Sequence, residues 1–223
     1  MYPRVKRLDN YNMIKVVERF YTESFGIEIS KEKCIGCGLC INACPNNVIS
    51  SLELNGKIRI KTEDLKPEIP DITKCSFCGT CAYICPVSAI KLKKDGKEIE
   101  IEQTGVVSSK VVPKLESESV FSEKFQEKIK KYFVGEIKVN WDKCVSCMSC
   151  VEVCPVNAFT RLKKTSDSKS KKVSFKQEKC IGCGTCARAC QAKAITYKLN
   201  KFNSSGDFKE IFWNSLLERV KVQ

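Results

Sequence analysis

The sequence predicts an α+β protein in which one β-loop-α-β unit is used four times. The main observation is a cysteine pattern, C-x-x-C-x-x-C-x-x-x-C, which occurs four times and uses all 16 cysteines. A lysine precedes each run, and a large apolar residue stands five positions after its last cysteine. Alternating apolar residues, typical of strands, precede the first and third runs. The lysines are Lys33, Lys74, Lys143 and Lys179, the apolar residues are Ile49, Ile90, Phe159 and Ile195, and the alternating pairs are Ile27 with Ile29 and Ile137 with Val139.

The spacing within each run points to iron–sulfur chemistry. Thiols at positions i, i+3 and i+6 of a short loop can converge on three corners of one cubane cluster. Proline follows the fourth cysteine in three runs, where its fixed φ suits the first position of a helix. We therefore predict four [4Fe-4S] clusters as cofactors. Their ligands are Cys34, Cys37, Cys40 and Cys44; Cys75, Cys78, Cys81 and Cys85; Cys144, Cys147, Cys150 and Cys154; and Cys180, Cys183, Cys186 and Cys190.

Two other uses of the cysteines fit the pattern less well. Disulfides are disfavoured because nothing in the sequence marks the chain as secreted. Zinc sites usually consist of two separated C-x-x-C pairs, often with histidine, and this chain has no histidine. A zinc-stabilised structural or interaction protein is the alternative from outside the redox class.

Each run resembles the signature of bacterial-type 2[4Fe-4S] ferredoxins, and the whole chain resembles an archaeal (methanogen) polyferredoxin. The fourth run departs from the signature at Gln191, which replaces the proline but removes no ligand. In such ferredoxins the fourth cysteine of one run ligates the cluster of the other run. The resemblance therefore implies crossed ligand sets. They are Cys34, Cys37, Cys40 and Cys85; Cys75, Cys78, Cys81 and Cys44; Cys144, Cys147, Cys150 and Cys190; and Cys180, Cys183, Cys186 and Cys154.

The resemblance also implies two tandem ferredoxin-like dicluster modules, joined by an insert that contains a β-hairpin and a helix. Below roughly 70 residues an apolar core rarely suffices unaided, so the metal–ligand bonds should supply much of the folding energy. We expect five segments: an N-terminal helical extension (1–25), module 1 (26–95), a cysteine-free connector (96–135), module 2 (136–200) and a C-terminal amphipathic helix (201–223).

Apolar spacing predicts the helices outside the modules. Met13, Val16, Val17, Phe20 and Tyr21 recur at helical spacing in the N-terminal segment. Residues 117–133 show a mostly helical pattern in the connector. Residues 207–220 carry an apolar stripe behind a candidate N-cap aspartate. Each of these faces either packs on its own module or docks to a partner.

Turn dipeptides predict the hairpins. Asn55-Gly56 lies within the alternating residues 52–60, and Asp95-Gly96 lies between two further apolar pairs. We also expect a strand over residues 106–112 and an exposed loop over residues 163–172, which are rich in lysine and serine.

The charge of the chain does not indicate a nucleic-acid partner. The formal net charge is +13 with every cysteine counted as a neutral thiol. Four oxidised clusters with their thiolates, at about −2 each, would bring it to about +5, and four reduced clusters to about +1. The lysines therefore balance anionic clusters, and no recognised nucleic-acid motif accompanies them. No apolar stretch approaches the roughly 18 residues of a membrane span. We expect a cytoplasmic protein.

The loops should differ in reduction potential. Gly36, Gly38, Gly182 and Gly184 let backbone amides approach the sulfur atoms, which favours the reduced state. The second and third runs lack most of these glycines, so four unequal potentials are expected. Phe77 and Trp141 lie beside ligands, where an aromatic ring could shield a cluster from water.

Four one-electron centres predict an electron relay. The chain has no dinucleotide-binding or Walker loop and no histidine base, so we expect an electron carrier without a catalytic site or a small-molecule substrate. Archaeal polyferredoxins serve formylmethanofuran dehydrogenases and energy-converting hydrogenases. The resemblance thus implies redox protein partners, with an integral iron–sulfur subunit of such a complex as the alternative to a freely diffusing carrier.

Overall fold

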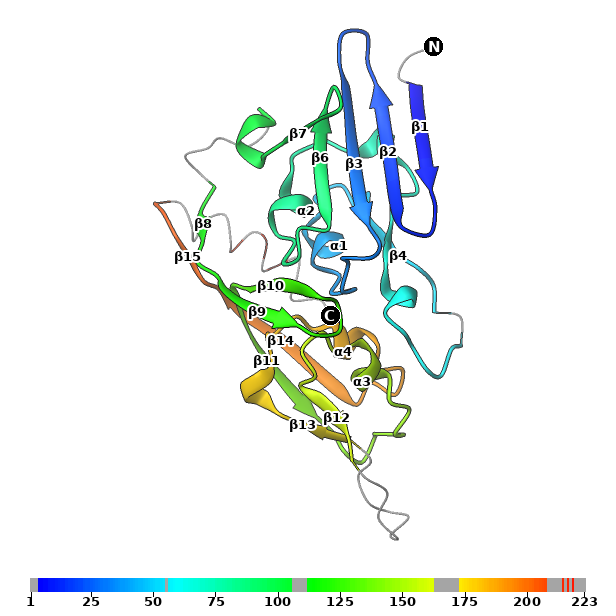
Figure 1. Cartoon of the computed structure of the whole chain (residues 1–223), viewed down its shortest axis with the longest axis vertical. Helices are drawn as coiled ribbons and strands as arrows, with labels where there is room; N and C mark the ends of the chain where they lie inside the picture. Colours follow the sequence, from blue (N-terminus) through cyan, green and yellow to red (C-terminus); the bar gives the residue numbers. More distant parts are fainter. Residues whose placement is uncertain are drawn as a thin grey trace.

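The computed structural model describes residues 4–54, 56–105, 112–162 and 173–207, together with Asn214, Leu216 and Glu218. Within these residues the fold is α+β, as predicted, with short helices behind the cysteine runs and antiparallel strands around them (Figure 1). No helix of the described residues is long and apolar enough to cross a membrane.

The two halves of the chain repeat one order of elements. In the first half a long strand, a cysteine loop with its helix and a short strand are followed by a short strand, a second loop with its helix and a long strand. The long strands β3 and β6 pair, and the short strands β4 and β5 pair. The elements are β3 (Ser24–Ser30), α1 (Leu39–Ala43), β4 (Ser50–Ser51), β5 (Pro67–Glu68), α2 (Thr80–Tyr83) and β6 (Ile90–Lys94).

The second half has the same order and the same pairing. Its long strands β11 and β14 pair, as do its short strands β12 and β13. The apolar residue five positions after each run is buried at the start of a strand or just before one, as the repeat predicts. The elements are β11 (Phe133–Val139), α3 (Ser149–Val153), β12 (Phe159–Arg161), β13 (Val173–Phe175), α4 (Thr185–Arg188) and β14 (Ile195–Phe202).

The predicted N-terminal helix is wrong. Residues 4–19 form the antiparallel strands β1 (Arg4–Asp9) and β2 (Met13–Arg19), which extend β3 and β6 into the sheet β1-β2-β3-β6-β7. Strand β2 buries alternate residues, Ile14, Val16 and Glu18. Its β-branched side chains favour a strand over a helix. The edge of β3 was available for hydrogen bonding, and this decided for the strand.

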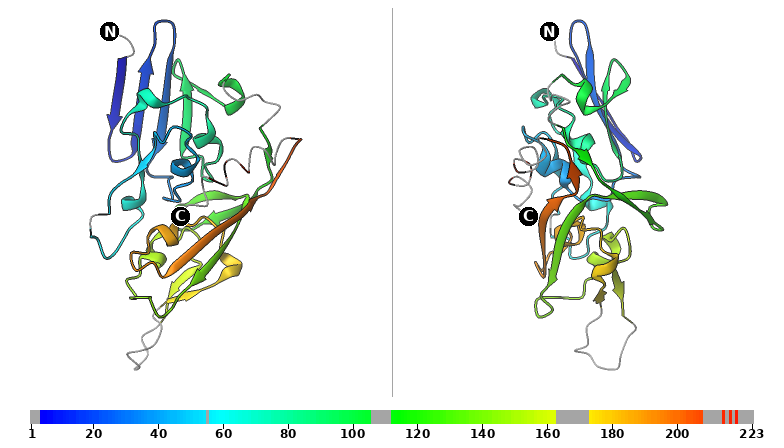
Figure 2. Two further views of the ribbon diagram at one scale, coloured as in Figure 1. Left: turned by 180° about the vertical axis from the view of Figure 1, so that it is seen from behind. Right: turned by 90° about the vertical axis from the view of Figure 1, so that its left-hand side faces the viewer.

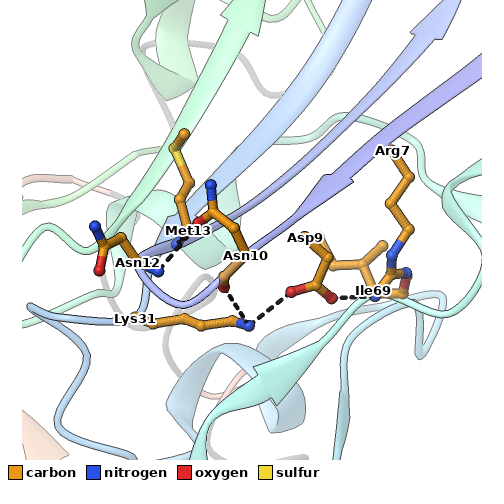
Figure 3. A network of polar contacts seen from close by, with 7 residues as sticks. All are labelled: Arg7, Asp9, Asn10, Asn12, Met13, Lys31 and Ile69. Carbon is orange, nitrogen blue, oxygen red and sulfur yellow. Dashed lines mark hydrogen bonds and ion pairs between the residues drawn. The ribbon is translucent and has the colours of Figure 1, made fainter.

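A polar network ties the β1–β2 turn to the start of the first cysteine loop (Figure 3). The side chain of Asn10 accepts hydrogen bonds from the amides of Asn12 and Met13 at 3.0 and 2.8 Å, which closes the turn. Lys31 donates to the Asp9 carboxylate at 2.6 Å and to the Asn10 carbonyl at 2.8 Å. Hydrogen bonds from Lys31 and Arg7 lower the pKa of Asp9. The N-terminal hairpin therefore braces the loop that follows β3.

The helix predicted in the connector is also wrong. Strands β9 (Glu118–Ser122) and β10 (Glu127–Lys131) form an antiparallel hairpin there, with Val120 opposite Ile129. This hairpin contacts both halves, since the Lys130 amide donates to the Pro86 carbonyl at 2.9 Å and the Ser122 hydroxyl donates to the Pro155 carbonyl. The hairpin lies between the two halves (Figure 2), and burial of Ile129 and Ser122 favours a strand over a helix there.

One of the two predicted hairpin turns is confirmed. Asp95 and Gly96, both at positive φ, join β6 to β7 (Lys97–Ile99). The chain also turns at Gly56, but no hairpin forms around it, because β4 pairs with β5 instead. Nearly all of the predicted strand over 106–112, the whole loop over 163–172 and most of the C-terminal helix over 207–220 lie outside the described residues.

Short elements complete the described chain. Strand β8 pairs with β15, and single 3-10 turns lead into the second and fourth cysteine loops. These elements are β8 (Lys114–Leu115), β15 (Ser204–Ser205), η1 (Glu63–Leu65), η2 (Ile72–Lys74), η3 (Ile101–Gln103) and η4 (Gln177–Lys179).

The halves share one hydrophobic core. Leu39 and Ile84 from the first half belong to the same buried cluster as Phe133 and Phe159 from the second. A buried hydrogen bond also crosses between them, from the Ile60 amide to the Ser149 hydroxyl at 2.9 Å. This packing brings cysteine loops from opposite halves next to each other.

Candidate metal centres

The four cysteine loops share one backbone conformation. The second residue after the first cysteine and the fourth residue after it both have positive φ in every run. Glycine fills most of these positions, but Phe77, Ser146 and Met148 adopt the same conformation at φ 50°, 55° and 69°. The Phe77 amide donates to Cys75 Sγ at 3.3 Å, just as the Gly182 amide donates to Cys180 Sγ. At Phe77 the missing glycine therefore does not remove this amide contact, contrary to the expectation that glycine is needed for it.

A second repeated turn supports the fourth cysteine of each run. Three residues after it the chain takes positive φ, at Asn47, Ser88, Asn157 and Lys193. This turn directs the next amide back to the thiol. The amides of Val48, Ala89, Ala158 and Ala194 each donate to the fourth cysteine Sγ of their run at 3.2 Å. Such donors stabilise a thiolate that ligates iron.

The 16 thiols gather in four groups, each with three cysteines of one run and the fourth cysteine of the run paired with it. For three of the groups the four thiols line one cavity. In the remaining group, Cys40 and Cys85 are the thiols that most strongly raise the pKa of Cys37, after burial. We name the groups site 1 (Cys34, Cys37, Cys40, Cys85), site 2 (Cys44, Cys75, Cys78, Cys81), site 3 (Cys144, Cys147, Cys150, Cys190) and site 4 (Cys154, Cys180, Cys183, Cys186).

The thiols in these sites are poorly solvated and close to one another. Burial raises the pKa of Cys81, and the other three thiols of site 2 raise it further. Burial and the other thiols of site 3 raise the pKa of Cys150 to about 12. Clustered thiols of this kind ionise when a cation pairs with them, because the metal replaces the lost hydration of the thiolates.

The donor set fits an iron–sulfur cluster. Each site offers four sulfur ligands, and backbone amides already point at several of them. Among the described residues, no three Cys, Asp or Glu side chains are close enough to share one metal ion. In the same part of the chain, the buried hydroxyls of Tyr132 and Tyr197 have no hydrogen-bond partner, and both lie near cysteine thiols. Sulfur atoms of a bound cluster would supply acceptors for them.

Side-chain hydroxyls distinguish the sites where the backbone does not. In sites 2, 3 and 4 a Thr or Ser follows the second cysteine of the run by two residues. Its hydroxyl oxygen lies 3.3 to 3.4 Å from the sulfur of that cysteine. A thiolate ligand can only accept, so the hydroxyl donates when iron is bound. The corresponding residue of site 1 is Leu39. The hydroxyls are those of Thr80, Ser149 and Thr185.

We expect Thr80→Val to lower the reduction potential of the site 2 cluster. Valine keeps the shape of threonine but removes the O–H donor 3.4 Å from Cys78 Sγ, and that donor favours the more negative, reduced state. A loss of roughly 1 kcal/mol corresponds to about 40 mV. A redox titration followed by EPR measures it. Leu39→Thr, which adds a hydroxyl at site 1, should have the opposite sign. Two unchanged potentials would contradict this role for the hydroxyl.

The two aromatic residues singled out from the sequence border the cavities as predicted. Phe77 lines the cavity of site 2 and stacks on Phe25, with ring centroids 5.1 Å apart. Trp141 lines the cavity of site 3. Both rings cover apolar surface beside ligands, which is consistent with shielding the site from water.

Sequence reasoning did not identify the groups around site 1, namely the phenols of Tyr132 and Tyr197 and the basic side chains of Lys66 and Arg188. The Lys66 amine donates to the carbonyls of Lys31 and Cys34, and the Arg188 guanidinium donates to the Gly36 carbonyl. One signal was available for Arg188. It occupies a repeat position that varies among the runs, with Asn42, Tyr83 and Glu152 as its equivalents.

The fold has short antiparallel strands around paired cysteine loops, and its thiols form four sites of four. These features place the chain in the class of iron–sulfur electron-transfer proteins. The chain belongs to the 4Fe-4S dicluster domain family. One family model of that description matches residues 33–89 and 143–194, and a second matches residues 74–159. The cofactors are therefore four [4Fe-4S] clusters, and the protein transfers electrons.

A solved structure shares the fold. It is a chain of the formate dehydrogenase, heterodisulfide reductase and formylmethanofuran dehydrogenase complex from Methanospirillum hungatei. The match has a TM-score of 0.77 at 20% sequence identity and covers 99% of this chain and 92% of that chain. No curated protein matches the sequence.

Proposed function

We propose that this chain is an electron-relay component of a multi-subunit oxidoreductase, with sites 1 to 4 as its ligand sets. The single observation that supports this most strongly is the grouping of the 16 thiols into four buried or half-buried sites that adjoin one another. When bound, each cluster accepts and releases one electron. The protein holds the clusters in place, limits water around them and directs amide and hydroxyl donors at their ligands.

The crossed ligand sets are part of this proposal. Three cavities, each lined by three cysteines of one run and the fourth cysteine of another, support sites 2, 3 and 4. The effect of Cys85 on the pKa of Cys37 supports site 1. In this arrangement metal links the two loops of each half, so that cluster binding contributes to the folding free energy of both loops.

We also propose that the halves act as two dicluster modules, with bounds near residues 26–95 and 136–200. Strands β1 and β2 extend the sheet of the first module, and the β9–β10 hairpin lies in the connector. Because this hairpin and the shared core contact both modules, the modules should keep a constant distance from each other.

The partners we propose are other redox subunits. The neighbour of similar fold is part of a complex that contains formate dehydrogenase, heterodisulfide reductase and formylmethanofuran dehydrogenase. A feature of this chain itself supports docking near site 3, where Val145, next to the ligand Cys144, is 65% exposed. The reducing chemistry of such a complex is compatible with the cytoplasm.

The test is anaerobic purification of the tagged chain from its own cells. We expect about sixteen irons per chain, uptake of about four electrons from a low-potential dye, and stoichiometric recovery of a catalytic redox subunit. A loaded chain that is recovered as a monomer would favour the freely diffusing carrier. A folded, colourless chain that holds zinc would contradict the proposal altogether.

A further inference from the structure

Sites 1 and 4 belong to different halves but meet directly. Arg188 follows the site 4 ligand Cys186 by two residues, yet its guanidinium donates to the Gly36 carbonyl in the site 1 loop. It also lies over Gly38, where an added methyl group would be only 2.8 Å from the guanidinium carbon. Burial raises the pKa of Cys34 and Cys40, and Arg188 is close enough to both thiols for its positive charge to oppose that rise. A cation from one half is thus placed against the cluster site of the other.

Tyr197 lies between the same two sites. Its ring packs so tightly on two glycines that a methyl group would be 2.7 Å from the ring at Gly184 and 2.5 Å from it at Gly135. Burial raises the pKa of Tyr197, and thiols of both sites raise it further, first Cys183 of site 4 and then Cys37 of site 1. Its side chain is 7% exposed, and its hydroxyl has no partner among the described residues.

Tyr132 is a second buried tyrosine near site 1, and it lies close enough to Tyr197 for the two to interact electrostatically. It is fully buried just after β10 and packs edge-on against Phe133, with ring centroids 4.8 Å apart. Burial raises its pKa, and Cys85 and Cys37 of site 1 contribute next. Its hydroxyl likewise has no hydrogen-bond partner in the described part of the chain. A buried hydroxyl with no acceptor is costly unless a ligand supplies one.

We propose that Tyr132, Tyr197 and Arg188 form the junction at which the two modules exchange electrons, with the sites arranged in the order 2, 1, 4, 3. The tyrosine hydroxyls donate hydrogen bonds to sulfur at sites 1 and 4, and Arg188 places a positive charge beside site 1. These three groups raise the potentials of the two inner sites. The inference rests on the proposed function.

The remaining contacts support this order. Across the first half, Cys81 of site 2 lies near enough to Cys40 of site 1 to raise its pKa, and across the second half Cys150 of site 3 does the same to Cys186 of site 4. The ligands of the two inner sites are also more buried than those of the two outer sites. Site 4 has three buried cysteines and site 1 has two, whereas site 2 has one and all four of site 3 are half-buried. The better solvated sites thus form the two ends, where partners can approach.

The step at the junction is balanced without a proton. One electron leaves site 1 and enters site 4, or the reverse, so that one site is oxidised as the other is reduced. The hydroxyls keep their protons throughout and act only through hydrogen bonds.

The test measures the potentials of all four clusters in Tyr132→Phe, Tyr197→Phe and Arg188→Gln by EPR-monitored titration of the loaded chain. We expect Tyr132→Phe and Arg188→Gln to shift the reduction equilibrium of site 1 about tenfold toward oxidised, or about 59 mV. Tyr197→Phe should shift site 4 by a similar factor. Variants that lose one cluster, Cys37→Ala with Cys85→Ala for site 1 and Cys154→Ala with Cys183→Ala for site 4, identify the signals.

Two controls separate the junction from a merely structural role. Tyr11→Phe removes the hydroxyl of a residue that is 90% exposed and should shift nothing, whereas Arg188→Lys keeps the charge and should restore most of the site 1 potential. Loaded Tyr and Arg variants with unchanged potentials would overturn the junction alone. A wild-type chain that accepts fewer than four electrons would overturn the proposed relay together with the junction.

Discussion

Replacing Cys37 and Cys85 together with alanine is expected to abolish one cluster and leave three intact. Both thiols belong to site 1, which would retain only two ligands, too few for a cubane that takes four. Iron should fall from about sixteen to about twelve per chain, and one signal should vanish from the EPR titration.

The matched control is Cys37→Ala with Cys44→Ala, which removes two cysteines of the same run. With crossed ligands it takes one ligand from site 1 and one from site 2, because Cys44 lines the cavity of site 2. Two clusters should then be damaged. If each run instead held its own cluster, the two double variants would exchange their behaviour, and iron analysis with EPR would show it.

Gly184→Ala is expected to destabilise the loaded protein by about 2–5 kcal/mol. Gly184 has φ +74°, a conformation that costs a residue with a side chain roughly 1–2 kcal/mol. The new methyl group would also lie 2.7 Å from the Tyr197 ring, and overpacking of a core typically costs about 1–3 kcal/mol. The midpoint of anaerobic denaturation, followed by the visible absorbance of the clusters, measures the loss.

Gly96→Ala separates these two contributions. Gly96 has φ +79°, but no atom lies within 4 Å of an added methyl group. It should therefore cost only the roughly 1–2 kcal/mol of backbone strain. Met148 holds the position equivalent to Gly184 in the third run at φ 69°, so the backbone of this loop position tolerates a side chain. Equal losses for the two alanine variants would contradict the role of the Tyr197 contact.

The sequence predicted secondary structure correctly where a local strand or turn pattern sets it. It failed where pairing with another segment decides between helix and strand. The strands before the first and third runs and the Asp95-Gly96 turn follow from local pattern. The segments around Val16 and Ile129 carry β-branched residues among charged ones, and their spacing suits either a helix or a strand. Hydrogen bonding to β3 in the first case and pairing within the β9–β10 hairpin in the second decided for strand.

By itself, the sequence determined the cofactor class and the fourfold unit and predicted the ligands, because thiols at a fixed spacing on a short loop leave few other metal chemistries open. Only the tertiary structure decided which groups surround the ligands and which loops meet. Arg188 touches Gly36 although 152 positions separate them, and Tyr197 reaches two sites from a strand whose pattern indicates only burial. Contacts between distant segments depend on how the halves pack, and no local spacing encodes that packing.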